Sequence, residues 1–143
     1  MQHQGLKRLD GLQDEFRGQV EALLDRLAVE GRYVCIVSGL RTIREQDKLY
    51  AQGRTAPGSI VTNAKGGSSA HNFARAVDLC PLDSHGALNW NDRETYKRIG
   101  ALAEELGLLW GGHFKSLVDM PHVESLDWKV TQAAWRNGKI DIA

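Results

Sequence analysis

Residues 68–81 read SSAHNFARAVDLCP, and this stretch decides most of what the sequence predicts about the fold. A turn of small residues leads into ARAVDLCPLD. In this segment apolar residues first alternate with other residues and then follow one another, a pattern typical of a central strand. His71 lies at the edge of this run and Asp78 lies within it, and His122 lies at the edge of a similar run in DMPHVE, residues 119–124. Catalytic zinc takes three ligands from histidine and carboxylate and leaves a fourth position to water. His71, Asp78 and His122 are therefore candidate zinc ligands, although histidines near an aspartate also occur in proteins that bind no metal.

The segments on both sides of this stretch predict helices and further strands. Apolar residues from 6 to 28 recur at steps of three and four, which indicates an amphipathic helical segment, broken near Gly11 or Gly18. YVCIVSG, residues 33–39, is typical of a buried strand. Thr42 followed by Glu45 is a helix-start signature, and the helix is expected to run to Gly53. ETYKRIGALAEELGL, residues 94–108, predicts another amphipathic helix that ends at Gly107.

A long loop separates two of these elements. Residues 53–69 are rich in glycine and small polar residues, with one short possible strand at SIVT, residues 59–62. A loop of this length in a small domain is usually functional. Helices and strands mix without regular alternation, so we expect an α+β fold with a small, largely antiparallel sheet packed by helices.

Length and composition indicate one ordinary globular domain. The chain has 143 residues, of which 42% are hydrophobic and 25% charged. We expect a single domain over 1–143, with an N-terminal helical segment at about 6–28, a core at about 33–126 and a tail at about 127–143. Lys plus Arg and Asp plus Glu both number 18, so the formal net charge is zero. The net charge therefore provides no electrostatic attraction to nucleic acid. The basic residues between 41 and 54 fit a solvated helix face.

The N-terminus and the hydropathy pattern bear on localisation. MQHQGLKRLDGLQDEF lacks the basic start, apolar run and cleavage site of a secretory signal. No window approaches the roughly 18 apolar residues of a membrane span. We therefore expect no signal peptide, no membrane insertion and synthesis in the cytoplasm.

The two cysteines and the remaining histidines are weaker candidates. Cys35 and Cys80 are too few for a disulfide scaffold and lie in strand-like runs, so buried free thiols are expected. Cys80 comes two residues after Asp78 and could share its face as a fourth ligand, but a closed site would leave no position for chemistry. His85 and His113 lie in turn-like segments and receive no ligand role. His3 is expected in a mobile terminus.

The motifs taken together resemble a known peptidase family, which groups D-alanyl-D-alanine carboxypeptidases, vancomycin-resistance dipeptidases and phage L-alanyl-D-glutamate endopeptidases. Its signature is SxHxxGxAxD followed downstream by [DE]xxH. The residues that match are Ser69, His71, Ala76, Asp78, Asp119 and His122. VSGLRT, residues 37–42, resembles the family's strand-to-helix segment, and Gln46, Leu49 and Tyr50 continue it. The sequence departs from the pattern at Ala74, where the family usually has glycine.

This resemblance implies a fold, a cofactor and residue roles. The fold would be that of the hedgehog and D-alanyl-D-alanine peptidase group, with zinc held by His71, Asp78 and His122. Asp119 would be the general base, although an ion-pair role is the alternative reading. Arg41 would face the scissile carbonyl or a substrate carboxylate. Ser69 and Gln46 would contact substrate, although the Ser69 hydroxyl could equally just shape its loop.

The resemblance also implies a substrate and a biological setting. The leading hypothesis is a phage or prophage endolysin that cleaves the L-alanyl-D-glutamate bond of the peptidoglycan stem peptide. It would act as a monomer, stay in the host cytoplasm and reach the wall in the periplasm after holin-dependent release. The alternatives are a D-alanyl-D-alanine dipeptidase or carboxypeptidase with the same zinc mechanism, and a non-catalytic zinc-stabilised binding domain. Retention of Asp119 and Arg41 argues against the last.

Overall fold

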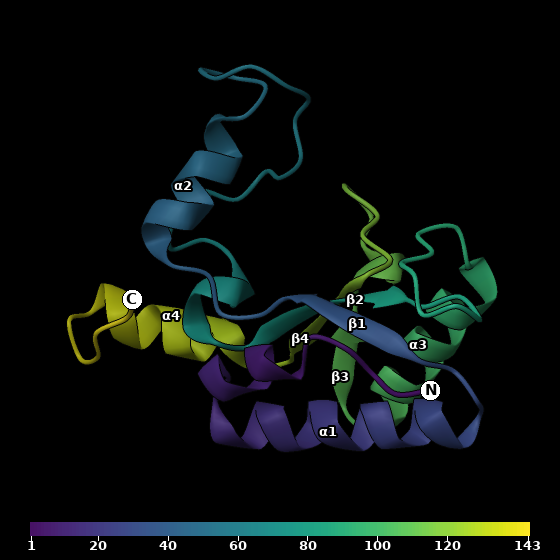
Figure 1. The fold of residues 1–143 in the computed structure, drawn as a ribbon. Coiled ribbons are helices and arrows are strands. Elements are labelled where there is room, and N and C mark those ends of the chain that lie inside the picture. Colours follow the sequence, from purple (N-terminus) through teal and green to yellow (C-terminus); the bar gives the residue numbers. More distant parts are fainter.

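The computed structural model describes all of residues 1–143 and folds them into one four-stranded sheet with helices around it (Figure 1). The strands lie in the order β1-β2-β4-β3, and each neighbouring pair is antiparallel. This confirms the predicted α+β class with a small antiparallel sheet. The elements in chain order are the 3-10 helix η1 Leu6–Gly11, α1 Asp14–Val29, β1 Val34–Ser38, α2 Ile43–Ala51, the 3-10 helix η2 Ala70–Phe73, β2 Ala76–Pro81, α3 Arg93–Glu105, β3 Leu108–Trp110, the 3-10 helix η3 Gly111–His113, β4 His122–Ser125 and α4 Trp128–Arg136.

The two faces of the sheet have different roles. Successive side chains of a strand point to opposite faces, so β2 sends Val77 and Leu79 to one face and Asp78 to the other. Val77 and Leu79 belong to the hydrophobic core, which α1 and α3 close from that side. In Figure 1, α1 runs along this covered face of the sheet. The opposite face is thereby left to carry the polar side chains of β2 and β4.

The N-terminal helical segment is interrupted as the sequence predicted. The 3-10 helix η1 ends at Gly11 and α1 begins at Asp14, so the break lies near Gly11, and Gly18 is inside α1. His3 is not in a mobile terminus, because its Nε2 donates to the carbonyl of Leu24 at 2.7 Å and its Nδ1 accepts from the amide of Val34 at 3.1 Å. These bonds hold the first residues against the edge of the sheet.

An arm, residues 43–66, extends from the sheet and consists of α2 and the loop after it (Figure 1). Its helix begins at the predicted capping box, in which the Glu45 amide donates to the Thr42 hydroxyl at 3.1 Å and the Thr42 amide donates to the Glu45 carboxylate at 2.9 Å. Arg54 fastens the loop by donating to the carbonyls of Tyr50 and Thr62 at 2.7 and 3.0 Å. The arm is therefore an ordered part of the molecule.

Two sequence expectations are corrected along the chain. Residues 59–62 form no strand, because they lie on the arm, away from any strand that could pair with them, and Ile60 and Val61 are exposed. The tail, for which no element was predicted, contains α4. This helix packs on η2, since the Phe73 ring lies 6.0 Å from the ring of Trp128 and 5.7 Å from that of Trp135.

No helix of the structure combines the length and the apolar character needed to cross a membrane.

Candidate metal centre and active-site cleft

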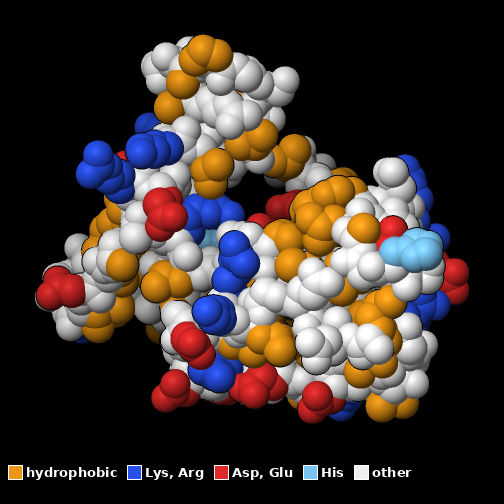
Figure 2. All heavy atoms as spheres, in the orientation of Figure 1, with side chains coloured by type: hydrophobic (Ala, Val, Ile, Leu, Met, Phe, Trp, Pro, Cys, Tyr) orange, Lys and Arg blue, Asp and Glu red, His pale blue; other side chains and the backbone are white.

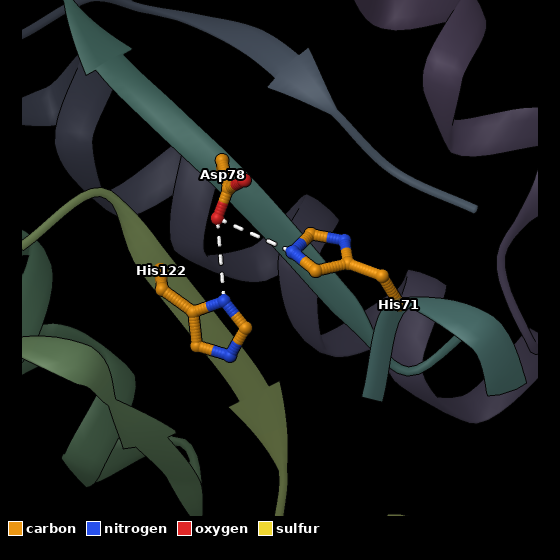
Figure 3. A group of neighbouring side chains, drawn as sticks. All are labelled: His71, Asp78 and His122. Carbon is orange, nitrogen blue, oxygen red and sulfur yellow. Dashed lines mark hydrogen bonds and ion pairs between the residues drawn. The ribbon is translucent and has the colours of Figure 1, made fainter. Parts of the chain in front are cut away.

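Strand register brings the predicted ligands together. Asp78 of β2 and His122 of β4 are direct cross-strand partners, so their side chains lie next to each other on the same face of the sheet. His71 comes from η2, the short helix just before β2, and points toward Asp78 from the side (Figure 3). His71 and His122 are far apart in the sequence, and the antiparallel pairing of β2 with β4 brings them close together in space.

The distances within this metal group, defined as His71, Asp78 and His122, fit a zinc ion. One donor atom from each of the three residues lies within 4.8 Å of the others. Asp78 Oδ1 is 3.3 Å from His71 Nε2 and 3.3 Å from His122 Nδ1. Zinc bonds of about 2.1 Å in a tetrahedron place neighbouring donor atoms about 3.4 Å apart. The arrangement therefore has both the donor types and the spacing of a catalytic zinc site.

The other nitrogen of each histidine is held by a hydrogen bond. His71 Nδ1 donates to the carbonyl oxygen of Gly39 at 2.8 Å, which leaves Nε2 free to bind a metal. His122 Nε2 donates to the carboxylate of Glu124 at 2.7 Å, which leaves Nδ1 for the metal. The second oxygen of Glu124 accepts from the indole of Trp128 at 2.6 Å. Both imidazoles are therefore oriented before any metal binds.

Sequence reasoning did not single out Glu124 as a functional residue. It lies two positions after His122 on β4, and residues two apart on a strand share a face. A carboxylate at that spacing from a predicted ligand was the signal that could have identified it.

The charges of the metal group stabilise one another without metal. Burial by itself would raise the pKa of Asp78, but hydrogen bonds from His122 and His71 outweigh it and hold that pKa well below its usual range. Burial would lower the pKa of His122, but its hydrogen bonds to Asp78 and Glu124 raise it to about 9. Asp78 is thus ionised, as a metal ligand must be, and His122 holds a proton that a metal would have to displace.

Asp119, the predicted general base, lies beside the metal group. Its carboxylate Oδ2 is 3.9 Å from His122 Nδ1, and its side chain is 44% exposed at the lining of a cleft. Partial burial and the negative charge of Asp78 raise the pKa of Asp119. Its amide donates to the carbonyl of Gly111 at 2.9 Å, which fixes the loop just before β4. Asp119 is in a position from which it can reach a water or substrate at the metal group.

Arg41 also reaches the metal group, and Gln46 holds it there. The guanidinium lies 3.5 Å from Asp78 Oδ2, and it donates to Ser38 Oγ at 2.9 Å and Gln46 Oε1 at 2.8 Å. Gln46 is fully buried and donates from Nε2 to the Ala64 carbonyl at 2.9 Å. Gln46 is not among the residues that line the cleft, and its amide joins Arg41 to the arm. A substrate contact by Gln46 stays a prediction.

The remaining candidates have different outcomes. Ser69 lines the cleft, and its hydroxyl accepts from the His71 amide at 3.2 Å as the N-cap of η2. A substrate contact by Ser69 stays a prediction. Cys80 is a buried free thiol outside the metal group, so it is no fourth ligand. His113 pairs with Glu104 at 2.8 Å and His85 is exposed, so neither joins the site.

The metal group lies in a cleft of about 730 Å³ between the arm and the body of the molecule. Figure 2 shows the hollow below the arm, with hydrophobic side chains on both of its sides. Arm residues such as Thr62 and Asn63 line one side, and Trp90, Phe114 and Leu117 are among those lining it elsewhere. A cleft of this size accommodates an extended ligand rather than a single small ion.

A His-Asp-His group with an adjacent carboxylate and arginine in an open cleft defines the class of zinc-dependent hydrolases. Comparison with known proteins agrees. Residues 62–125 match a family of M15 peptidases described as D-alanyl-D-alanine carboxypeptidase. The peptidoglycan L-alanyl-D-glutamate endopeptidase CwlK of Bacillus subtilis (strain 168) is 38% identical over 114 residues, which cover 74% of this chain and 68% of that protein. The chain belongs to this M15 peptidase family.

Solved structures support the fold. The L-Ala D-Glu endopeptidase ChiX of Serratia marcescens superposes with a TM-score of 0.65 at 19% identity, over 98% of this chain and 95% of its own. The D,D-pentapeptidase VanY, an E175A mutant in complex with Zn(II), superposes with a TM-score of 0.61 at 16% identity, over 89% and 79%. The chain belongs to a family of metallopeptidases, and its metal group has the donor atoms that bind zinc. The protein is therefore a metallopeptidase with zinc as its cofactor.

Proposed function

We propose that this protein is a zinc-dependent peptidoglycan hydrolase that cleaves the L-alanyl-D-glutamate bond of the stem peptide. The observation that carries the proposal is the metal group facing an open cleft, in a chain 38% identical to a peptidoglycan L-alanyl-D-glutamate endopeptidase. The metal group supports the chemistry, and the sequence relative supports the choice of bond.

Asp119 is the proton carrier of the proposed reaction. Zinc held by the metal group supplies a Lewis acid for peptide hydrolysis. Asp119 takes a proton from the attacking water as the water oxygen bonds to the alanyl carbonyl carbon. It gives that proton to the glutamate nitrogen as the C–N bond breaks. The raised pKa of Asp119 favours this role, because it makes the carboxylate a stronger base.

Arg41 is the electrostatic partner. Its guanidinium is fixed by Ser38 and Gln46 and is the sole Lys or Arg side chain lining the cleft. A fixed cation stabilises the negative charge that develops on the carbonyl oxygen, or binds a substrate carboxylate, without reorganising during the reaction.

The test is a digest of purified disaccharide-pentapeptide muropeptide followed by mass spectrometry. The expected products are the disaccharide carrying L-alanine and a tetrapeptide that begins with D-glutamate. Asp119→Asn should bind zinc but lose at least about a hundredfold in rate, since general-base catalysis contributes at least that much. Asp25→Asn, on the exposed surface of α1, is the matched control and should keep full rate.

The second candidate function is a D-alanyl-D-alanine dipeptidase or carboxypeptidase with the same residues. It is favoured by the description of the family that residues 62–125 match. The same digest separates the two, because release of terminal D-alanine with the L-alanyl-D-glutamate bond intact would contradict the endopeptidase and support the carboxypeptidase.

We propose further that the activity serves bacterial lysis as an endolysin, with the enzyme held in the host cytoplasm until a holin opens the inner membrane. The support is the resemblance of its motifs to phage endopeptidases and its similarity to a peptidoglycan endopeptidase. Cells that express the protein should lyse only when a holin is expressed with it. Lysis without the holin would contradict this route of release.

A further inference from the structure

Trp90 is a large apolar side chain at a polar site. It lines the cleft of the metal group, yet it is 50% exposed. An exposed indole next to a functional cleft is typical of a surface that a ligand covers. We propose that Trp90 is the platform for a sugar ring, the muramoyl residue to which the stem peptide is attached. This inference rests on the proposed endopeptidase function.

The turn that carries Trp90 is braced. The Asn89 amide donates to the Pro81 carbonyl at the end of β2 at 2.8 Å, and the Asn91 amide donates to the Asn89 side chain at 3.2 Å. The next residue, Asp92, caps α3 by accepting from the Thr95 amide at 3.0 Å. The backbone on both sides of Trp90 is thus held between a strand end and a helix start. A braced backbone loses little conformational entropy when a ligand covers the side chain that it carries.

The position of the scissile bond requires a sugar close to the metal group. In the stem peptide, L-alanine is joined by an amide bond to the lactyl group, whose ether oxygen lies on the muramic acid ring. One residue and the lactyl group therefore separate the cleaved bond from a sugar ring, a reach of about 7 Å of extended chain. An enzyme that cuts at this bond must accommodate the sugar, or leave it just outside, on the amino side of the metal group.

The charges of the cleft favour one orientation of the substrate. The peptide beyond the scissile bond carries carboxylates, beginning with the α-carboxylate of D-glutamate, and Arg41 is the sole Lys or Arg lining the cleft. The amino side carries an uncharged sugar whose ring has an apolar face of C–H groups. Trp90, Phe114 and Leu117 offer apolar surface that suits this face, and none of them carries a positive charge to attract a carboxylate. In this orientation Arg41 binds the carboxylates of the peptide and Trp90 packs against the sugar ring.

The test compares two substrates that differ by the sugar alone. One is the disaccharide-pentapeptide and the other is the same pentapeptide without the disaccharide, both followed by kcat/KM for L-alanyl-D-glutamate cleavage. Wild type should prefer the disaccharide form. Trp90→Ala should reduce that preference by about tenfold, which corresponds to the loss of about 1.4 kcal/mol of apolar contact with the sugar. Trp90→Phe, which keeps an aromatic face, should retain most of it.

Leu88→Ala is the matched control. Leu88 is 46% exposed on the same connection between β2 and α3 but does not line the cleft, so its replacement should leave the preference unchanged. An equal loss on both substrates in Trp90→Ala would overturn the sugar platform and show a peptide contact instead. An unchanged preference would overturn it too. Failure of wild type to cut either substrate at this bond would overturn the proposed function itself.

Discussion

At the scale of single residues, the site depends on groups that orient Arg41 and the two histidines of the metal group. Gln46 is buried behind Arg41, Glu124 is bound to His122, and the Gly39 carbonyl orients His71. Each orients Arg41 or a histidine of the metal group through a hydrogen bond. Catalytic groups need such support because small displacements reduce the rate strongly.

Gln46→Leu tests whether Arg41 must be held. Removing the amide frees the guanidinium from the arm, so we expect kcat to fall by about ten- to a hundredfold while the zinc content stays at one equivalent. Steady-state kinetics with metal analysis measures both. Gln52→Leu is the control, because the Gln52 amide also donates to an arm carbonyl, that of Ser59, but does not contact Arg41. Equal rates for the two variants would contradict the role of Gln46.

Ala74 stands where the family usually has glycine, and its backbone conformation shows why glycine is suited to this position. Its φ of 58° and ψ of 32° are left-handed, the region that glycine adopts without strain. That conformation costs alanine about 1–2 kcal/mol, of which the greater flexibility of unfolded glycine offsets a part. Ala74→Gly should therefore stabilise the protein by about 0.5–1 kcal/mol in urea unfolding. Ala22→Gly, inside α1, should destabilise it, and the same sign for both would refute this explanation.

The raised pKa of His122 predicts how zinc binding depends on pH. Below its pKa of about 9, a proton occupies the imidazole in the metal-free protein, and zinc must displace it. Apparent affinity should therefore rise by about tenfold per pH unit between about pH 7 and 9 and level off above. Competition with a chromogenic chelator measures this. Glu124→Gln should move the plateau to lower pH, whereas an affinity independent of pH would contradict the assignment.

At the scale of elements, the antiparallel pair β2 and β4 builds the centre, and η2 and α4 brace it from one side. Gly67, just before η2, donates its amide to Asn72 at 3.0 Å and has a φ of 84°. A side chain there would overlap the ring of Trp135, which α4 holds against Phe73. The packing of α4 therefore restricts the size of the residue at position 67, four residues before His71.

Gly67→Ala tests this packing. We expect destabilisation of more than about 2 kcal/mol, since both the backbone angle and the ring oppose a methyl group. Gly138→Ala is the control, with a φ of 71° and open space around it, and should lose about 1 kcal/mol. Thermal unfolding of both measures the difference. Equal losses would show that α4 does not press on this segment.

The same elements show how far the sequence could be read. His71, Asp78 and His122 could be predicted because the motif fixes residue types and spacing around one strand. The capping box of α2 is equally local. The burial of Gln46 behind Arg41 could not be predicted, because it depends on how the arm folds back, which no local pattern encodes. The run at 59–62 has strand-like residues, but a strand also needs a neighbour, and the arm provides none.

At the scale of the whole molecule, one sheet separates a structural face from a chemical face. The core under α1 and α3 fixes the strand register, and the register fixes the metal group on the other side. The arm adds a second side to the cleft and carries the residue that holds Arg41. With zinc bound at the metal group, this cleft is the active site of a peptidase.

The dependence of activity on zinc can be measured by titrating metal-stripped protein with zinc, with cleavage of the disaccharide-pentapeptide as the readout. Wild type should have no activity without metal and recover it in proportion to zinc, up to one equivalent. His71→Ala, which removes one ligand, should bind zinc far more weakly and recover nothing at one equivalent. Full activity in the metal-stripped protein, or wild-type recovery by His71→Ala, would show that zinc at the metal group is not needed for catalysis.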